Sequence, residues 1–272
     1  MTFQELFHNE KPVIGMIHTN HGDGLSVLEL AQREVEIYLK NGIYPLIENY
    51  FGSTDDCEEV LKWMQKAHSD SIYGVNILGD YEEAFELADE YGARFIQIDS
   101  VCGHLEPNHD EEYEDELKWL RKRYPNIAVF GGVRFKYQAV RSGRTTSEDL
   151  RIGMVRCDAI VCTGEGTGIE TPLRKVEKFK TVVRNFPVIV GAGVTLEHLE
   201  ETLTKSDGVI VGSWFKHEHD VVNTVCEKYV EDFMEVASAC NRTFTDEVID
   251  KPEPCVYGPP SWYDDNGNLK RN

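Results

Sequence analysis

Three ionisable side chains stand at or just beyond the ends of apolar runs, where acid–base chemistry is favoured. Glu48 and Asp99 close two of these runs, and Lys136 follows a third. A carboxylate at the mouth of an apolar site is partly desolvated, which raises its pKa toward neutrality. A lysine there can act as a base, an electrophile or a Schiff-base nucleophile. We predict these three as catalytic residues, although each alone also fits a structural ion pair.

Two neighbouring apolar runs end in glycine, which is typical of a phosphate site. One reads GAGV around Gly191 and Gly193, and the next reads VGSWFK around Gly212 and Ser213. Glycine lets backbone N–H groups approach an anion, and a serine hydroxyl donates beside them. Lys216 is expected to add positive charge there. The alternative is that these glycines only turn tight corners between elements.

Eight strand-like runs are needed to position these residues. They cover residues 12–18, 44–49, 73–78, 94–99, 126–133, 158–164, 187–193 and 208–213. Amphipathic helical stretches such as 28–42 and 81–93 separate the runs. Strands that alternate with helices require a parallel sheet, and eight units favour a closed (β/α)8 TIM barrel of the α/β class. The alternative, an open doubly wound sheet, favours a G-x-G-x-x-G turn after the first strand, which HTNHGDG is not.

In a TIM barrel the reactive residues lie at the carboxyl ends of the strands, so the polar residues there are candidates for the site. They add four substrate-binding candidates to those above: His18, Asn49, Asn76 and Thr163. The stretch GEGTGIETP from Gly164 has the glycine content of a mobile active-site loop, and its threonines equally suit helix caps.

Histidines raise the question of a metal centre. HTNH holds His18 and His21, and KHEH holds His217 and His219. A zinc-dependent barrel hydrolase is expected to carry H-x-H on its first strand and further histidines on later strands, whereas the fifth and sixth runs supply none. We therefore predict no metal and no other cofactor.

Composition narrows the class of partner. The net charge of −20 repels the phosphates of nucleic acid and of anionic membranes. No apolar run approaches the roughly 18 residues that span a bilayer. Seven cysteines without a C-x-x-C pair, and a start without a secretory signal, favour a cytoplasmic protein with reduced thiols. The expected partner is a small phosphorylated ligand, and a homo-oligomer is compatible with this composition.

The chain divides into two parts by composition. Residues 1–240 carry the predicted barrel, whose last helix is expected within 221–240. Residues 241–272 hold four of the ten prolines, which predicts an irregular extension. Tyr257, Trp262 and Tyr263 argue against a fully solvated tail, so we expect it to pack on the barrel or on a neighbouring subunit.

Six blocks in register carry a family resemblance. KPVIGMIH, YGVNIL, GARFIQID, DAIVCTGEGTG, PVIVGAGVT and DGVIVGSWFK resemble successive blocks of the BtpA/SgcQ family over about residues 10–238. The resemblance implies a ribulose-phosphate-binding type of barrel. It also links one kind of member to photosystem I biogenesis and describes another as a nucleotide-directed enzyme. The chain departs from the family pattern at TNHGDG after His18 and at GGVRFKYQ around Lys136.

These observations lead to one main functional prediction and two alternatives. The main prediction is an enzyme of lyase or isomerase type that acts on a sugar phosphate or nucleotide by acid–base chemistry at the barrel mouth. The first alternative is a nucleotide or nucleoside hydrolase. The second is a non-catalytic assembly or biogenesis factor of the BtpA type, because barrels host many functions.

Overall fold

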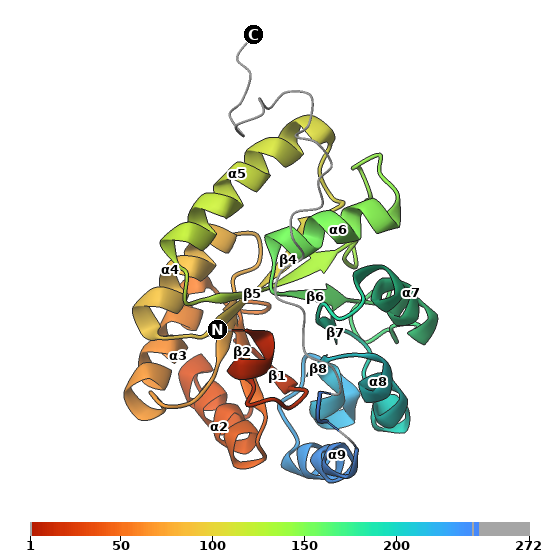
Figure 1. Cartoon of the computed structure of the whole chain (residues 1–272). Coiled ribbons are helices and arrows are strands. Elements are labelled where there is room, and N and C mark those ends of the chain that lie inside the picture. Colours follow the sequence, from red (N-terminus) through yellow and green to blue (C-terminus); the bar gives the residue numbers. More distant parts are fainter. Residues whose placement is uncertain (1, 241, 245–272) are drawn as a thin grey trace.

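Eight parallel strands pair in chain order and close on themselves, so the predicted TIM barrel is confirmed (Figure 1). The computed structural model describes residues 2–240 and 242–244. The strands are β1 (Val13–His18), β2 (Tyr44–Glu48), β3 (Gly74–Asn76), β4 (Phe95–Cys102), β5 (Ala128–Val133), β6 (Ala159–Cys162), β7 (Val188–Val190) and β8 (Gly208–Val211). Pairing of β1 with β8 completes the cylinder.

Helices surround the strands as an outer ring (Figure 1). They are α1 (Phe3–Leu6), α2 (Val27–Lys40), α3 (Thr54–Ala67), α4 (Tyr81–Tyr91), α5 (Pro107–Arg123), α6 (Thr146–Arg156), α7 (Leu173–Val183), α8 (Leu199–Lys205) and α9 (Glu227–Ala239). The last helix begins at Glu227, later than predicted, because the chain before it pairs back on the loop after β8 through the bridge between Lys216 and Val225.

Local sequence signals explain where several helices begin and end. Ser26, Ser53 and Thr145 each cap a helix and form a capping box with the acidic residue three positions on. Gly92 ends α4 in the left-handed conformation with φ of 77°, which glycine adopts without steric cost. These caps therefore set where α2, α3 and α6 begin, after the loops that follow β1, β2 and β5.

Alternation along the strands separates the barrel interior from its outer layer. Ile14, Leu46, Phe95 and Phe130 point inward and form one apolar cluster, in which the rings of Phe95 and Phe130 stack 4.8 Å apart. Gly74 belongs to the same layer, and any side chain there would overlap the ring of Phe95. The interior is thus a packed core, and the polar residues Glu48 and Gln97 stand at the next inward positions of β2 and β4, toward the carboxyl ends.

The short helix α1 closes the amino end of the barrel, and the sequence analysis did not anticipate it. Thr2 caps it in a capping box with Glu5, a pattern visible as TFQE. Phe3 and Phe7 are buried against the interior cluster, and Phe244 packs on the ring of Phe3. In Figure 1 this helix lies across the barrel end that faces the viewer.

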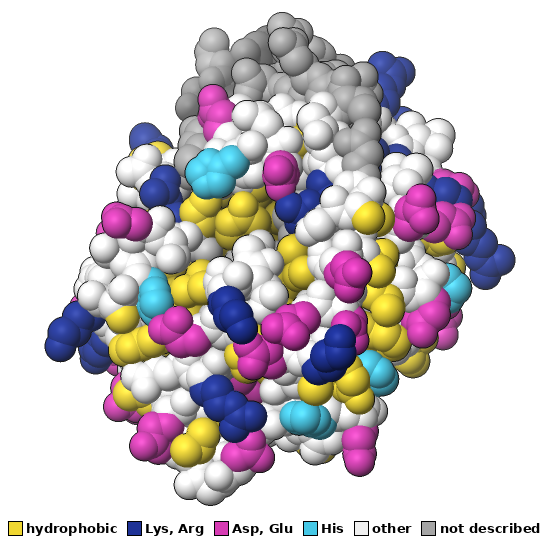
Figure 2. Space-filling model, turned by 90° about the horizontal axis from the view of Figure 1, so that it is seen from below, with side chains coloured by type: hydrophobic (Ala, Val, Ile, Leu, Met, Phe, Trp, Pro, Cys, Tyr) yellow, Lys and Arg dark blue, Asp and Glu magenta, His cyan; other side chains and the backbone are white. Residues whose placement is uncertain are grey.

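The surface carries charges of both signs between apolar side chains, without one dominant patch on the face drawn in Figure 2. Within the described part of the chain, no helix has the length and apolar character needed to cross a bilayer. Most of the predicted extension, residues 245–272, lies outside the described residues. Residues 242–244 run beside Glu10 and Lys11, where the Lys11 N–H donates to the Arg242 carbonyl at 2.7 Å.

Candidate active site

A cavity of about 130 Å³ lies at the carboxyl ends of the strands. It brings together eight of the eleven predicted site residues: His18, Glu48, Asp99, Lys136, Gly191, Gly193, Gly212 and Ser213. Their convergence follows from strand alternation. His18, Glu48 and Gly212 stand two positions beyond the inward apolar residues of β1, β2 and β8, so they point to the same axis.

Two carboxyl groups in this cavity are joined by one amide. The Asn76 Nδ2 donates to Glu48 Oε1 at 2.8 Å and to Asp99 Oδ1 at 3.3 Å. Gln97, two positions before Asp99 on β4, donates to the same Asp99 oxygen at 3.2 Å. On the other side, His18 Nε2 lies 3.4 Å from Glu48 Oε2. Asn76 therefore does not line the cavity itself but fixes the relative position of its two acids.

The electrostatics of the site keep two of these groups, Glu48 and His18, uncharged at neutral pH. Burial, together with the negative charge of Asp99, raises the pKa of Glu48 to about 8. Burial and the positive charges of Lys216 and Lys136 hold the pKa of His18 well below its ordinary value. At neutral pH Glu48 thus carries a proton and His18 is uncharged. His18 Nδ1 is buried and has no hydrogen-bond partner among the described residues.

Lys136 is held from both sides by the loops after β5 and β6. Its N–H donates to Thr163 Oγ1 at 3.0 Å, and its Nζ donates to Thr167 Oγ1 at 3.1 Å. The predicted candidate Thr163 therefore supports Lys136 from outside the cavity. Arg134 fixes the start of the same loop through Asp149, 2.8 Å away.

The loop between β6 and α7, which contains GEGTGIETP, lies over the cavity. Thr167 and Gly168 line the cavity, and the Thr167 N–H donates to the Tyr137 hydroxyl at 2.7 Å. Thr171 Oγ1 donates to the Ala192 carbonyl at 2.8 Å, which ties the loop to the end of β7. Gly193 has φ of 63°, and any side chain there would overlap the loop backbone at Ile169. Gly193 is therefore needed for the loop to close on β7.

The chain after β8 lines the cavity at Gly212 and Ser213. Gly212 precedes a single 3-10 turn at Ser213–Phe215 and lines the cavity together with Ser213. A Cβ at Gly212 would come no closer than 3.5 Å to its nearest neighbour, His18 Cε1, so space for a ligand lies on this side. Backbone dipoles of such a turn can hold an anion where the surrounding walls are partly dry.

The role predicted for Lys216 needs revision. Lys216 does not serve the anion site, because it is buried and its Nζ pairs with both carboxylate oxygens of Glu34 at 3.0 Å. It instead fixes α2 to the chain after β8, since a buried cation requires a partner. His219 stacks on Trp214 with ring centroids 4.0 Å apart. No cluster of three or more metal-binding side chains occurs within residues 2–240 and 242–244.

Other residues differ from the predicted set. Asn49 lies outside the cavity and accepts a hydrogen bond from the Leu78 N–H at 2.8 Å, so it links the ends of β2 and β3. Gln97, Tyr50 and Tyr137 line the cavity but were not predicted. Alternation alone points to Gln97, which stands two positions before Asp99. No local pattern indicates Tyr50 or Tyr137, because both come from loops.

The chain is similar to known proteins in sequence and in fold. The BtpA family model matches residues 9–239. An uncharacterized protein of Thermococcus kodakarensis is 32% identical over 258 residues, 86% of this chain and 97% of that protein. The photosystem I biogenesis protein BtpA of Synechocystis is 23% identical over 279 residues, 93% of this chain and 97% of that protein. The solved N-(5'-phosphoribosyl)anthranilate isomerase from Pyrococcus furiosus shares the fold, with a TM-score of 0.54 at 18% identity over 84% of this chain and 98% of that one.

Proposed function

This chain belongs to the BtpA family, and we propose that it is an enzyme that transfers protons on a small phosphorylated metabolite. One observation carries the proposal. Two carboxyl groups share a cavity and an Asn76 bridge, and burial beside Asp99 raises the pKa of Glu48 to about 8. A carboxyl group that keeps its proton at neutral pH can serve as an acid beside a second carboxyl group that serves as a base.

In this proposal Asp99 is the base and Glu48 is the acid. Burial and the negative charge of Asp99 raise the pKa of Glu48, so Glu48 keeps its proton at neutral pH. Asp99 takes a proton from a carbon next to a carbonyl, and Glu48 gives its proton to the carbonyl oxygen. Lys136 supplies positive charge to the enediol-like intermediate. Isomerisation uses this step. Aldol-type carbon–carbon cleavage passes through the same kind of intermediate, with the base taking the proton of the hydroxyl group on the carbon that departs as an aldehyde, and the α-carbon being protonated afterwards.

The phosphate of the substrate would lie against the ends of β7 and β8. Gly193, Gly212 and Ser213 line the cavity there. Oriented backbone dipoles hold an anion without a desolvated cation, which suits a chain whose net charge is −20. The anthranilate isomerase that shares the fold has a phosphoribosyl substrate in its name, and this agrees with the proposed class of ligand.

The size of the cavity favours a short substrate. The enclosed space measures about 130 Å³. A short sugar phosphate fits this space better than a nucleotide. A larger ligand requires the loop after β6 to move away from Tyr137 and Ala192, to which it is hydrogen-bonded.

Deuterium exchange tests the proposed chemistry without knowledge of the product. The protein is incubated in D2O with short phosphorylated aldoses and ketoses, and carbon-bound deuterium is followed by NMR. We expect exchange in at least one compound and a loss of roughly 10²–10⁴-fold in Asp99→Asn. A carboxylate on the surface of α9 serves as the matched control: Asp232→Asn should exchange at the parent rate.

A paired substitution tests the phosphate site separately. Inorganic phosphate should raise the melting temperature of the parent protein, because it binds the folded state alone. Ser213→Glu places a negative charge in the site and should weaken phosphate binding at least about tenfold. The neutral variant Ser213→Gln should lose less affinity for phosphate. Equal losses in the two variants would mean that Ser213 does not face the phosphate.

The two tests also separate the enzyme from a BtpA-type biogenesis factor. Phosphate binding without exchange in any compound would reject the catalytic proposal and leave a binding protein. The name of the Synechocystis relative favours this second function. Absence of both binding and exchange would reject the site as a whole.

A further inference from the structure

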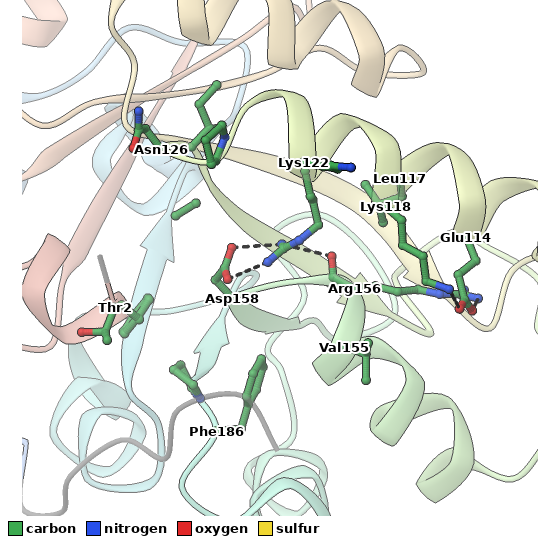
Figure 3. A pocket seen from close by; sticks show the side chains of 16 residues that line it. Thr2, Glu114, Leu117, Lys118, Lys122, Asn126, Val155, Arg156, Asp158 and Phe186 are labelled. Atoms are coloured by element: carbon green, nitrogen blue, oxygen red, sulfur yellow. Dashed lines mark hydrogen bonds and ion pairs between the residues drawn. The ribbon is translucent and has the colours of Figure 1, made fainter. Parts of the chain in front are cut away.

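A second and larger cavity lies at the amino end of the barrel, opposite the candidate active site. Its volume is about 680 Å³, and its walls come from α1, α5, the end of α6 and the residues that precede β5, β6 and β7. Figure 3 shows Phe186, Asp158 and the side chains of α5 around this hollow. We call it the basal groove. No step of the proposed reaction uses it.

The lining of the basal groove holds more cations than anions, in a chain whose net charge is −20. Four lining side chains are cationic and two, Glu114 and Asp158, are anionic. Lys118 and Arg156 both pair with Glu114, and Arg156 also pairs with the buried Asp110. Arg121 binds Asp158 with both Nη atoms, at 3.0 and 2.8 Å, as the dashed lines in Figure 3 mark. Lys122, by contrast, is exposed and makes no hydrogen bond or ion pair with another described residue. An acidic partner would therefore find a cation available.

The walls between these charges are apolar. Leu117 and Phe186 are buried at the floor, and Pro125 is exposed at the rim. Val155 at the end of α6 leaves 48% of its surface exposed. Apolar walls beside a free cation suit a segment that combines acidic residues with proline and aromatic rings.

We propose that the basal groove binds residues 245–272 of the same chain. This segment holds six acidic and three basic residues, four prolines, and the rings of Tyr257, Trp262 and Tyr263. Its composition thus complements both the charge and the apolar walls of the groove. Docking here would place the aromatic side chains against Val155 and Phe186.

The last described residues bring the chain to the edge of the groove. Phe244, the last described residue, packs on Phe3 with ring centroids 6.1 Å apart, and Phe3 lines the groove. At about 3.3 Å per residue, the segment that follows is long enough to cross the groove several times. Covalent attachment also raises its effective concentration to the order of mM, so even weak contacts would keep it bound.

A second copy of the chain is the competing occupant, and charge argues against it. Two such grooves facing each other across a two-fold axis would bring Lys122 and its neighbours against the same cations. Like charges placed together disfavour that pairing. The acidic segment has no such conflict.

Hydrogen–deuterium exchange of the full-length protein tests this inference. Amides of residues 245–265 should exchange at least about tenfold more slowly than in a free peptide of the same sequence, because docking protects them. Val155→Asp should return exchange to the rate of the free peptide, and so should Lys122→Glu to a smaller extent. Val222→Asp is the matched control, since Val222 is 54% exposed and follows β8 at the other end of the barrel. It should leave the segment protected.

Three outcomes would overturn the inference. Exchange at the free-peptide rate in the parent protein would show that the segment does not dock. Protection that survives both Val155→Asp and Lys122→Glu would place it on another surface. Protection that rises with protein concentration would assign the groove to a second copy. The exposure of Val155 and Lys122 makes both variants compatible with folding, which circular dichroism checks.

Discussion

At the scale of single residues, Glu48 couples the proposed chemistry to stability. Its carboxyl group is ordinary in the unfolded chain, with a pKa near 4.5, and is raised to about 8 in the folded protein. Between these values the folded state holds a proton that the unfolded state has released. Stability therefore falls as the pH rises through this window and is not affected by this group below it.

Replacement of Glu48 by glutamine should remove this pH dependence. Between about pH 5 and pH 8 the parent protein should lose roughly 3–4 kcal/mol relative to Glu48→Gln, as measured by urea unfolding at each pH. Glu201→Gln, at an exposed site on α8, should follow the parent curve. Parallel curves for the parent and Glu48→Gln would show that the proton is not held by Glu48.

If Glu48 is the acid, the exchange rate in D2O should also fall above about pH 8.

The sequence predicted individual site residues only on the strands, where side chains alternate between the inside and the outside of the barrel. Glu48 and Asp99 close strand-like runs, and their inward position follows from the apolar residues before them. Lys216 was assigned to the anion because it follows Gly212 and Ser213 closely. The sequence does not reveal that its partner is Glu34, which lies 182 positions away.

Among the secondary-structure elements, helix α1 closes the amino end of the barrel. Phe7 is fully buried, and its ring lies 4.7 Å from Tyr44 and 5.9 Å from both Phe95 and Phe130. These contacts join a four-residue helix to three different strands. The helix is too short to be stable alone, so packing must hold it in place.

Phe7→Ala should therefore destabilise the protein by about 3–5 kcal/mol, as expected for loss of a buried ring. Chemical unfolding measures the change. Phe51→Ala, at a residue that is 40% exposed near the barrel mouth, should cost less than about 1 kcal/mol. A cost below that level for Phe7→Ala would mean that α1 can leave the barrel without effect.

The elements were predicted best where a periodic pattern coincided with a cap. The helix Tyr81–Tyr91 ends at Gly92 as its sequence indicated. The helix α1 was missed because its four residues contain no full hydrophobic period, although its capping box was legible. The start of α9 was placed too early because the apolar residues Val221 and Val222 resemble a helix face. Tertiary pairing of Val225 with Lys216 overrides that local pattern.

At the scale of the whole molecule, excess negative charge acts against the folded state. The chain has 48 acidic and 28 basic residues, so like charges repel across the surface. The Debye length falls from about 30 Å at 0.01 M salt to about 8 Å at 0.15 M. Closure of the barrel was predictable from the count of eight strand–helix units. Whether attraction or repulsion dominates among the surface charges was not predictable, because the fold sets the distances between them.

Added salt should accordingly raise the melting temperature. From about 10 to 150 mM NaCl we expect an increase of about 2–4 °C, measured by differential scanning fluorimetry at neutral pH. KCl should give the same increase, since screening does not depend on the identity of the cation. A decrease would show that attractive pairs such as Lys40 with Glu227 outweigh the overall repulsion.

The position of α1 at the amino end of the barrel also determines how the protein can be immobilised on a surface. Thr2, which caps α1, and Phe244, which packs beside it, both lie at the base of the barrel, while the cavity opens at the other end. A tether joined to the start of the chain would hold the protein by its base. On a sensor chip or a bead, every copy would then present the open end of its barrel to the flowing solution, and dissolved small molecules would reach the cavity unhindered.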